Sequence, residues 1–128
     1  MRVISIAALV AGVVLACSPP STVGGTMRNP NVITREDIAN SNVYNVYDAV
    51  SMLRPAFLNS HGSTTISGSD TGYPRVYLNH ILFGDLQSMR SLDVHGVSEI
   101  HYYNGAEASA RFGLGNVSGA IEIISDAH

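Results

Sequence analysis

The first apolar segment of the chain runs from Val3 to Ala16 and is interrupted only by Ser5. Arg2 is the single charge that precedes it. The segment is shorter than the roughly 20 apolar residues that a membrane-spanning helix needs, and its length is typical of the apolar part of a signal peptide. The pattern therefore predicts a cleaved secretory leader over residues 1–16.

Helical spacing begins after residue 31, where we expect the folded domain (32–126) to start. Thr34 offers a hydroxyl N-cap with the acidic Asp37 three positions later, which predicts a short helix. Apolar residues recur at helical spacing over 45–53, and Pro55 is expected to end this second helix. Asp85 is expected to cap a third short helix.

Strand-like segments separate these helices. In the segment 74–78, Val76 and Leu78 are predicted on one face, with Arg75 and Tyr77 on the other. Short helices interspersed with short strands predict a two-layer α+β domain with a small mixed sheet of about four short strands. The expected strands cover 64–67 at an edge, 74–78, 97–103 and 120–124, and a further helix covers 106–112.

Composition and charge narrow the class of protein. Hydrophobic residues make up 45% of the 128 residues and charged residues 13%, which is apolar enough for one domain with a buried core. The net charge is -3, and all seven basic residues are Arg. The chain has no basic stripe of the kind that binds a phosphate backbone, so we expect no nucleic-acid partner.

The only cysteine, Cys17, follows the apolar segment directly, which excludes a disulfide scaffold. Val14-Leu15-Ala16-Cys17 resembles the lipobox of bacterial lipoproteins, which implies acylation of Cys17. Ser18 in place of Asp implies sorting to the outer membrane, facing the periplasm. Residues 17–31 are rich in Pro, Gly, Ser and Thr and are expected to form a flexible tether. The alternative is a free cysteine after an ordinary leader.

The order of motifs from residue 34 onward resembles the plug domain of TonB-dependent outer-membrane receptors. In that family a strand of the type V-x-x-I-E-V is followed by a turn, a small-residue helix ending in Phe-Gly or Tyr-Gly, and a glycine-rich return to a strand. The corresponding segments here are Thr34-Arg35-Glu36-Asp37-Ile38, Asn45–Val50, Pro74–Asn79, Val97–Tyr103, Asn104-Gly105-Ala106, Ala108–Gly113 and Gly119–Ile123.

The resemblance implies a plug-like fold over most of residues 32–125, and the sequence also departs from the family in places. Ser67-Gly68 stands where the family has Arg-Gly, and Asn79-His80 where it has Asp-Gly. Only three residues follow Ser125, so we expect a plug-like domain without the surrounding barrel. Three glycines are expected at structural turns, namely Gly105, Gly113 and Gly119. Gly105 permits a tight turn, and Gly113 can adopt a left-handed conformation.

The candidate binding surface combines the central strand with the loops 59–73 and 79–84. The tyrosines either present aromatic rings at an interface or complete the core, and the pattern leaves both readings open, with Tyr102 and Tyr103 on opposite faces of their strand. The residues predicted to bind a partner or ligand are Tyr73, Arg75, Tyr77, Asn79 and His80.

Catalytic and metal-binding motifs are sparse. The five histidines show neither H-x-x-x-H nor H-E-x-x-H spacing, and Asp93-x-His95, with His101 as a third group, is the closest approach to a metal site. The chain contains no Gly-x-Ser-x-Gly and no dinucleotide fingerprint. We therefore expect no enzyme activity, no metal and no cofactor.

Two functions are compatible with these features. The favoured hypothesis is a lipid-anchored, non-enzymatic binding or interaction module at the outer membrane. The second is an accessory or split subunit that works with a separate outer-membrane barrel in the uptake of siderophores or glycans. Either hypothesis implies an envelope protein, a barrel or another, as a partner, and neither identifies a ligand.

Overall fold

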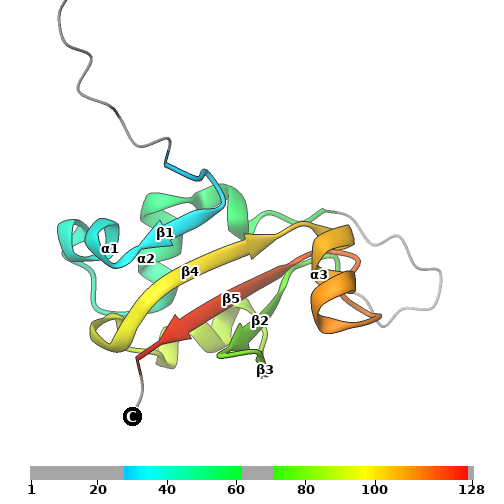
Figure 1. The fold of residues 1–128 in the computed structure, drawn as a ribbon. Helices are drawn as coiled ribbons and strands as arrows, with labels where there is room; N and C mark the ends of the chain where they lie inside the picture. Colours follow the sequence, from blue (N-terminus) through cyan, green and yellow to red (C-terminus); the bar gives the residue numbers. More distant parts are fainter. Residues whose placement is uncertain (1–27, 62–70, 127–128) are drawn as a thin grey trace, which may run out of the picture.

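The computed structural model describes residues 28–61 and 71–126 (Figure 1). The predicted leader, Cys17, most of the tether and the predicted edge strand over 64–67 lie outside these residues. In chain order the elements are β1 (Val32–Thr34), α1 (Arg35–Ser41), α2 (Val46–Leu53), the 3₁₀ helix η1 (Pro55–Leu58), β2 (Arg75–Leu78), β3 (Ile81–Gly84), the 3₁₀ helices η2 (Leu86–Ser91) and η3 (Val94–Gly96), β4 (Val97–Tyr103), α3 (Gly105–Phe112) and β5 (Ala120–Ser125).

The strands form one mixed five-stranded sheet in the order β1-β4-β5-β2-β3. β2 and β5 run parallel, and the other neighbouring pairs are antiparallel. The α+β prediction is confirmed, as are the strands now labelled β2, β4 and β5. The sheet has five strands where about four were expected, because β1 and β3 also join it.

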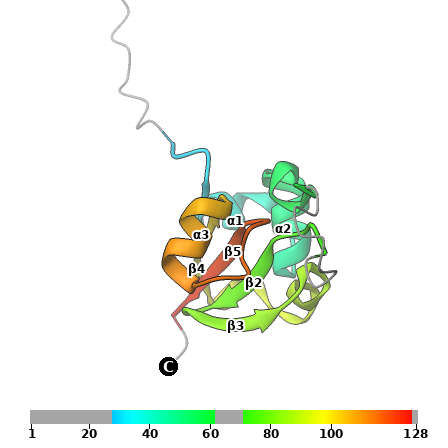
Figure 2. The ribbon, with the colours of Figure 1, turned by 90° about the vertical axis from the view of Figure 1, so that its right-hand side faces the viewer.

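The two faces of the sheet are covered unequally (Figures 1 and 2). α1, α2 and the 3₁₀ helices lie on one face, where Val76, Ile100 and Ile123 belong to the main hydrophobic core. α3 lies on the other face near one end, over a small cluster of Tyr77, Ala108 and Ala120. The predicted alternation along β2 and β4 is confirmed, since Tyr102 packs against the main core and Tyr103 against the small cluster.

Short polar residues begin the helices, as predicted. Thr34 and Asp37 form a reciprocal capping box, in which the Asp37 N–H donates to Thr34 Oγ1 and the Thr34 N–H donates to Asp37 Oδ2. Asp85 caps η2 by accepting from the Ser88 N–H at 3.0 Å. α2 ends at Leu53, before Pro55, with Asn45 as its N-cap. Local sequence thus determines where these helices begin.

The structure corrects the prediction for Asn104-Gly105 at the start of α3. These two residues were predicted as a turn, whereas Asn104 is the N-cap of α3 and Gly105 is its first residue. Gly105 is required by space, because an added Cβ would lie 2.1 Å from the Val117 carbonyl oxygen. Gly113 and Gly119 do have positive φ angles, of 90° and 95°. The ψ of −179° at Gly113 differs from the left-handed helical value that was expected.

We expect the domain to lose stability in acid through its capping carboxylates. Hydrogen bonds from Ser88 and from the His95 backbone hold the pKa of Asp85 and of Asp93 below the usual value of about 3.9. A carboxyl whose folded-state pKa is lowered stabilises the fold above its unfolded-state pKa, and this contribution disappears as the pH falls through the folded-state value.

The test is the free energy of unfolding, measured by urea titration from pH 5 to pH 2. Asn caps a helix about as well as Asp but does not titrate. The variant Asp85→Asn/Asp93→Asn should therefore show a shallower decline in stability with falling pH than the original chain. Parallel curves for the two proteins would show that these carboxylates do not contribute to the loss of stability in acid.

Candidate functional site

The five predicted binding residues fall into two environments. Tyr73 is 48% exposed, whereas Tyr77 is 6% exposed beneath α3. The Tyr77 ring stacks on Phe112 with centroids 3.9 Å apart, and its hydroxyl donates to Asn116 Oδ1 at 2.9 Å. Of the two readings for the tyrosines, Tyr77 fits the core and Tyr73 fits an exposed surface. Arg75 lies between them on β2 and is partly buried.

Asn79 and His80 form the tight turn between β2 and β3, as predicted. Their φ angles are 47° and 71°, which suits a two-residue hairpin turn. Asn79 Oδ1 accepts from the Ser125 N–H at 2.9 Å, and the Asn79 N–H donates to Ile123 O at 2.9 Å. These bonds attach the hairpin to the end of β5. His80 is 65% exposed at its side chain and turns toward Glu122.

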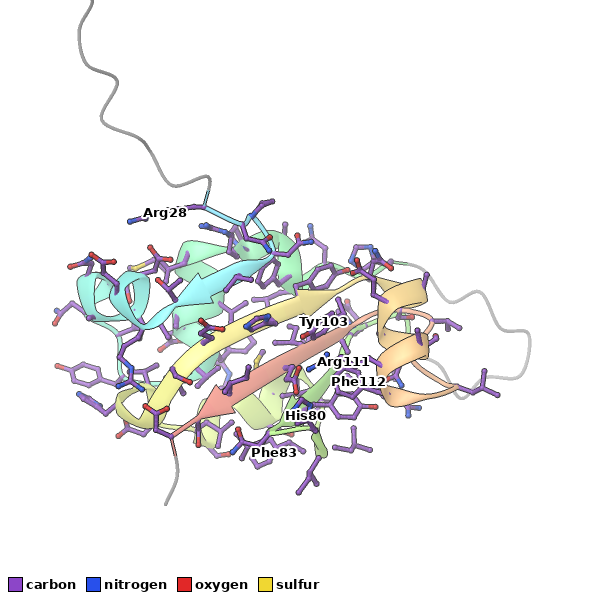
Figure 3. All side chains as sticks on the ribbon, viewed as in Figure 1. Arg28, His80, Phe83, Tyr103, Arg111 and Phe112 are labelled. Carbon is purple, nitrogen blue, oxygen red and sulfur yellow. The ribbon has the colours of Figure 1, made fainter. Side chains whose placement is uncertain are left out.

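Glu122 is the centre of a polar cluster that the sequence analysis missed, and Figure 3 labels three of its neighbours, His80, Tyr103 and Arg111. Its side chain is fully buried on β5. Oε2 accepts hydrogen bonds from Tyr103 Oη at 3.0 Å and from Arg111 Nε at 3.2 Å. Oε1 lies 2.5 Å from His80 Nδ1, but within the described residues no donor is oriented to hydrogen-bond it. One carboxylate therefore joins β4, β5, α3 and the β2–β3 turn.

The cluster is arranged to hold a negative charge away from water. A buried carboxylate is costly unless it is paired and hydrogen-bonded, and the Arg111 guanidinium, the Tyr103 hydroxyl and the His80 ring surround this one. Burial, followed by the hydrogen bond to Glu122, raises the pKa of Tyr103, so its hydroxyl remains a donor. Tyr103 on β4 and Arg111 on α3 both donate to Glu122 on β5, so the cluster holds α3 against the sheet.

The signal for this cluster was present in the sequence. Glu122 is the single charged residue within the apolar strand 120–124, and its place between two isoleucines puts it on the face opposite the main core. Its partners could not be identified from the sequence. Tyr103, Arg111 and His80 are 19, 11 and 42 positions away along the chain, and the sheet register together with the packing of α3 brings them to Glu122.

β3 presents the second unexpected feature, an exposed apolar edge. Ile81, Leu82 and Phe83 are 73%, 53% and 38% exposed. The sequence analysis treated 79–84 as a binding loop, whereas the structure shows a hairpin in which Tyr77 pairs with Leu82. The two-residue turn flanked by apolar residues was the local signal for this hairpin. A bulge after Val76 leaves Phe83 without a directly paired residue.

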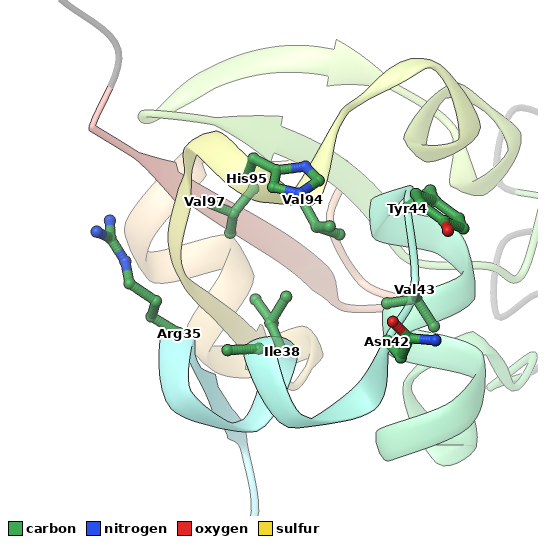
Figure 4. A pocket seen from close by; sticks show the side chains of 9 residues that line it. Arg35, Ile38, Asn42, Val43, Tyr44, Val94, His95 and Val97 are labelled. Atoms are coloured by element: carbon green, nitrogen blue, oxygen red, sulfur yellow. The ribbon is translucent and has the colours of Figure 1, made fainter.

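Two surface hollows lie in different parts of the domain. One of about 230 Å³ lies beside β3 and is lined by Tyr73, Arg75, Leu82 and Asp85, among others. A second, of about 260 Å³, lies between α1 and η3, with Ile38 and His95 on its wall (Figure 4). The first hollow contains two of the predicted binding residues together with an exposed side chain of β3, and so extends the apolar edge.

Two of the histidines, His95 and His101, lie beside carboxylates that are close in the sequence. His95 Nδ1 lies 2.5 Å from Asp93 Oδ1, and His101 Nε2 lies 2.6 Å from Glu99 Oε2. In the part of the chain that the structure describes, no three His, Cys, Asp or Glu side chains gather closely enough to hold a metal ion. Across the same residues, no helix has the length and apolar character needed to span a bilayer.

Comparisons of the chain with protein-family models, with curated proteins and with solved structures found no match. The fold and the site define a small α+β domain that has a buried polar cluster around Glu122 and an apolar edge strand, β3.

Proposed function

We propose that the protein is a non-enzymatic interaction module, attached by an acylated Cys17 to the periplasmic side of the bacterial outer membrane, with a domain that resembles a TonB-dependent receptor plug. The lipobox-like segment Val14–Cys17 supports the attachment. An anchor made of more than one acyl chain gives stable membrane attachment. The order of motifs from Thr34 to Ile123 supports the plug-like class.

The observation that carries an interaction function is the apolar edge at β3. Exposed apolar side chains that stand singly are ordinary, but consecutive ones on the edge strand of a sheet provide a docking surface at which a further strand can pair. Ile81, Leu82 and Phe83 meet this description, and Tyr73 extends the apolar surface next to them. An extended segment of another protein chain would add to the sheet at this edge.

The test is capture of envelope proteins by the tagged full chain in detergent extract. We compare the original chain with Leu82→Lys, which places a charge on the edge, and with the matched control Leu114→Lys. Leu114 is 97% exposed in the loop after α3 and lies outside the proposed surface. Binding should be lost in Leu82→Lys and retained in the control. If no envelope protein binds the original chain more strongly than it binds Leu82→Lys, the proposed function is wrong.

A further inference from the structure

A third hollow, of about 470 Å³, lies where the described chain enters the domain, and Figure 3 labels Arg28 beside the start of β1. Small-molecule sites commonly have volumes of roughly 300–1,000 Å³. Three segments that are distant in the sequence meet there, namely the residues before β1, the region of η1 and the end of β4. Its wall combines two arginines with rings and small apolar side chains, which include Arg28, Arg54, Phe57, Tyr102, Pro30 and Ala56.

The aromatic part of this wall is held in place by its own contacts. Phe57 is 4% exposed, and its ring stacks on Tyr102 with centroids 5.0 Å apart. The Tyr102 hydroxyl and His61 Nε2 share a hydrogen bond of 2.7 Å. Rings that are already fixed by packing offer an apolar surface to a ligand at a low cost in conformational entropy. This part of the hollow is therefore preformed for an apolar group.

The two arginines are oriented by contacts that use only part of each guanidinium. Arg54 donates from Nε to Pro30 O at 3.2 Å and from Nη1 to Leu53 O at 2.7 Å. Arg28 Nη1 donates to Asp37 Oδ1 at 2.7 Å. A guanidinium carries five N–H donors in a rigid plane, so the edges that these bonds leave over can hold an oxyanion. The cations are thus fixed before a ligand arrives.

The charges around the hollow place an anion at the arginines. A backbone hydrogen bond, and in addition the charges of Arg28 and Arg54, hold the pKa of Asp37 below its usual value. Two guanidinium groups thus act on one carboxylate, which leaves one positive charge in excess in this group. None of the described residues that line the hollow is acidic. At the Tyr102 hydroxyl, by contrast, burial and then the Glu107 carboxylate raise the pKa, which disfavours an anion there.

We propose that this hollow is a binding site for a singly charged oxyanion with an adjoining apolar group. The oxyanion pairs with Arg28 and Arg54, and the apolar group lies against the rings of Phe57 and Tyr102. Charge-assisted bonds from arginine to an oxyanion are short and directional, and one negative charge balances the excess positive charge. The hollow adjoins the start of β1, at the opposite edge of the sheet from β3, so this site is independent of the proposed interaction function.

Two sources supply this chemistry. One is a free carboxylate attached to an aromatic ring, and the other is the phosphodiester headgroup of a membrane lipid. The lipid is a candidate because Arg28 is the first described residue after the predicted tether. Basic side chains close to a membrane anchor attract anionic headgroups.

An NMR titration of the isotope-labelled full chain in nonionic detergent micelles tests the site, with naphthoate as the probe. The reporters are the Arg54 Nε–H, which the Pro30 carbonyl holds in place, and the Ala56 amide. Free probe concentrations are corrected for partition into empty micelles. Naphthoate should shift both signals saturably and bind at least about tenfold more tightly than neutral naphthamide or than acetate, which lacks the ring.

Substitutions assign the binding to the two arginines. Arg28→Met and Arg54→Met should each raise the naphthoate Kd at least about fivefold, read at the Ala56 amide. Arg90→Met is the matched control and should leave Kd unchanged, since Arg90 is 52% exposed on η2, outside this hollow. If Arg54→Met does not fold, Arg28→Met decides, because its side chain is 68% exposed. Equal Kd values for naphthoate and naphthamide, or for Arg28→Met and Arg90→Met, overturn the proposal.

Competition with short-chain lipids distinguishes the two sources. Displacement of naphthoate by dihexanoyl phosphatidylglycerol, but not by dihexanoyl phosphatidylcholine, assigns the site to a lipid phosphodiester. Failure of both lipids to displace it assigns the site to a free carboxylate. Equal displacement by both lipids means that apolar contact alone determines binding, and this result overturns the proposal.

Discussion

Replacing Gly105 with alanine is expected to destabilise the domain by about 3 kcal/mol, because the added methyl group has no space. An ideal Cβ at this position lies 2.1 Å from the Val117 carbonyl oxygen and 2.8 Å from its carbonyl carbon. The obstacle is backbone, so it cannot be relieved by rotating a side chain. In an ordinary helix, alanine is more favourable than glycine by up to about 1 kcal/mol. The clash therefore outweighs and reverses the usual preference.

The loop that contains Val117 is held in place and cannot easily move aside. Asn116 is 2% exposed, accepts a hydrogen bond from the Tyr77 hydroxyl at 2.9 Å and donates one to Gly113 O at 2.9 Å. A shift of Val117 would disturb these bonds, and an unpaired buried polar group costs about 1–3 kcal/mol. The steric clash with Val117 and the disturbance of the Asn116 hydrogen bonds therefore both destabilise Gly105→Ala.

Thermal unfolding by circular dichroism measures this effect, with Gly96→Ala as the matched control. An added Cβ at Gly96 meets nothing within 4 Å. We expect Gly105→Ala to lower Tm by at least about 10 °C and Gly96→Ala to leave it within a few degrees. A Tm for Gly105→Ala equal to that of the control would mean that α3 does not approach Val117 this closely.

The sequence predicted those parts of the fold that depend on neighbouring residues. Thr34 and Asp85 begin helices because their side chains accept from backbone N–H groups three positions later, a contact that sequence spacing alone defines. Alternation along β4 likewise placed Tyr102 and Tyr103 on opposite faces. The same kind of reasoning could have placed Glu122 on one face of β5, which the sequence analysis did not do, but it could not have identified the partners of Glu122.

The parts that the sequence did not predict depend on contacts between distant segments. β3 is four residues long and mostly apolar, so its pattern alone does not separate a strand from a loop. Its identity is decided by pairing with β2 across the Asn79-His80 turn. Gly105 was assigned to a turn because Asn-Gly favours turns locally, whereas the tertiary approach of Val117 is what excludes a side chain.

The second large effect is expected when Arg111 is removed from the buried carboxylate of Glu122. Arg111→Met keeps much of the apolar stem beside Tyr103 but removes the guanidinium that pairs with Glu122, and leaves the Tyr103 hydroxyl and the His80 ring beside the carboxylate. Breaking a buried ion pair on one side costs about 3–5 kcal/mol when the remaining charge is uncompensated. Arg111 is 42% exposed, so solvent screens the pair in part and we expect a smaller loss of about 2–3 kcal/mol.

A double-mutant cycle separates the cost of the orphaned charge from the loss of packing. Glu122→Gln removes the charge itself and should cost about 1–2 kcal/mol through weakened hydrogen bonds. In Arg111→Met/Glu122→Gln no charge is left buried, so the double variant should be more stable than the sum of the single changes by about 1–2 kcal/mol. Urea unfolding at constant pH measures all four proteins.

The control cycle uses the exposed pair of Arg35 and Asp126, whose side chains are 57% and 55% exposed. Solvent screens such a pair, so Arg35→Met and Asp126→Asn should each change stability by less than about 0.5 kcal/mol and show little coupling. If Arg111 and Glu122 behave in the same additive way, the carboxylate is not held as a buried charge. Strong coupling in the first cycle alone would instead identify the pair of Arg111 and Glu122 as a contact that fixes α3 to the sheet.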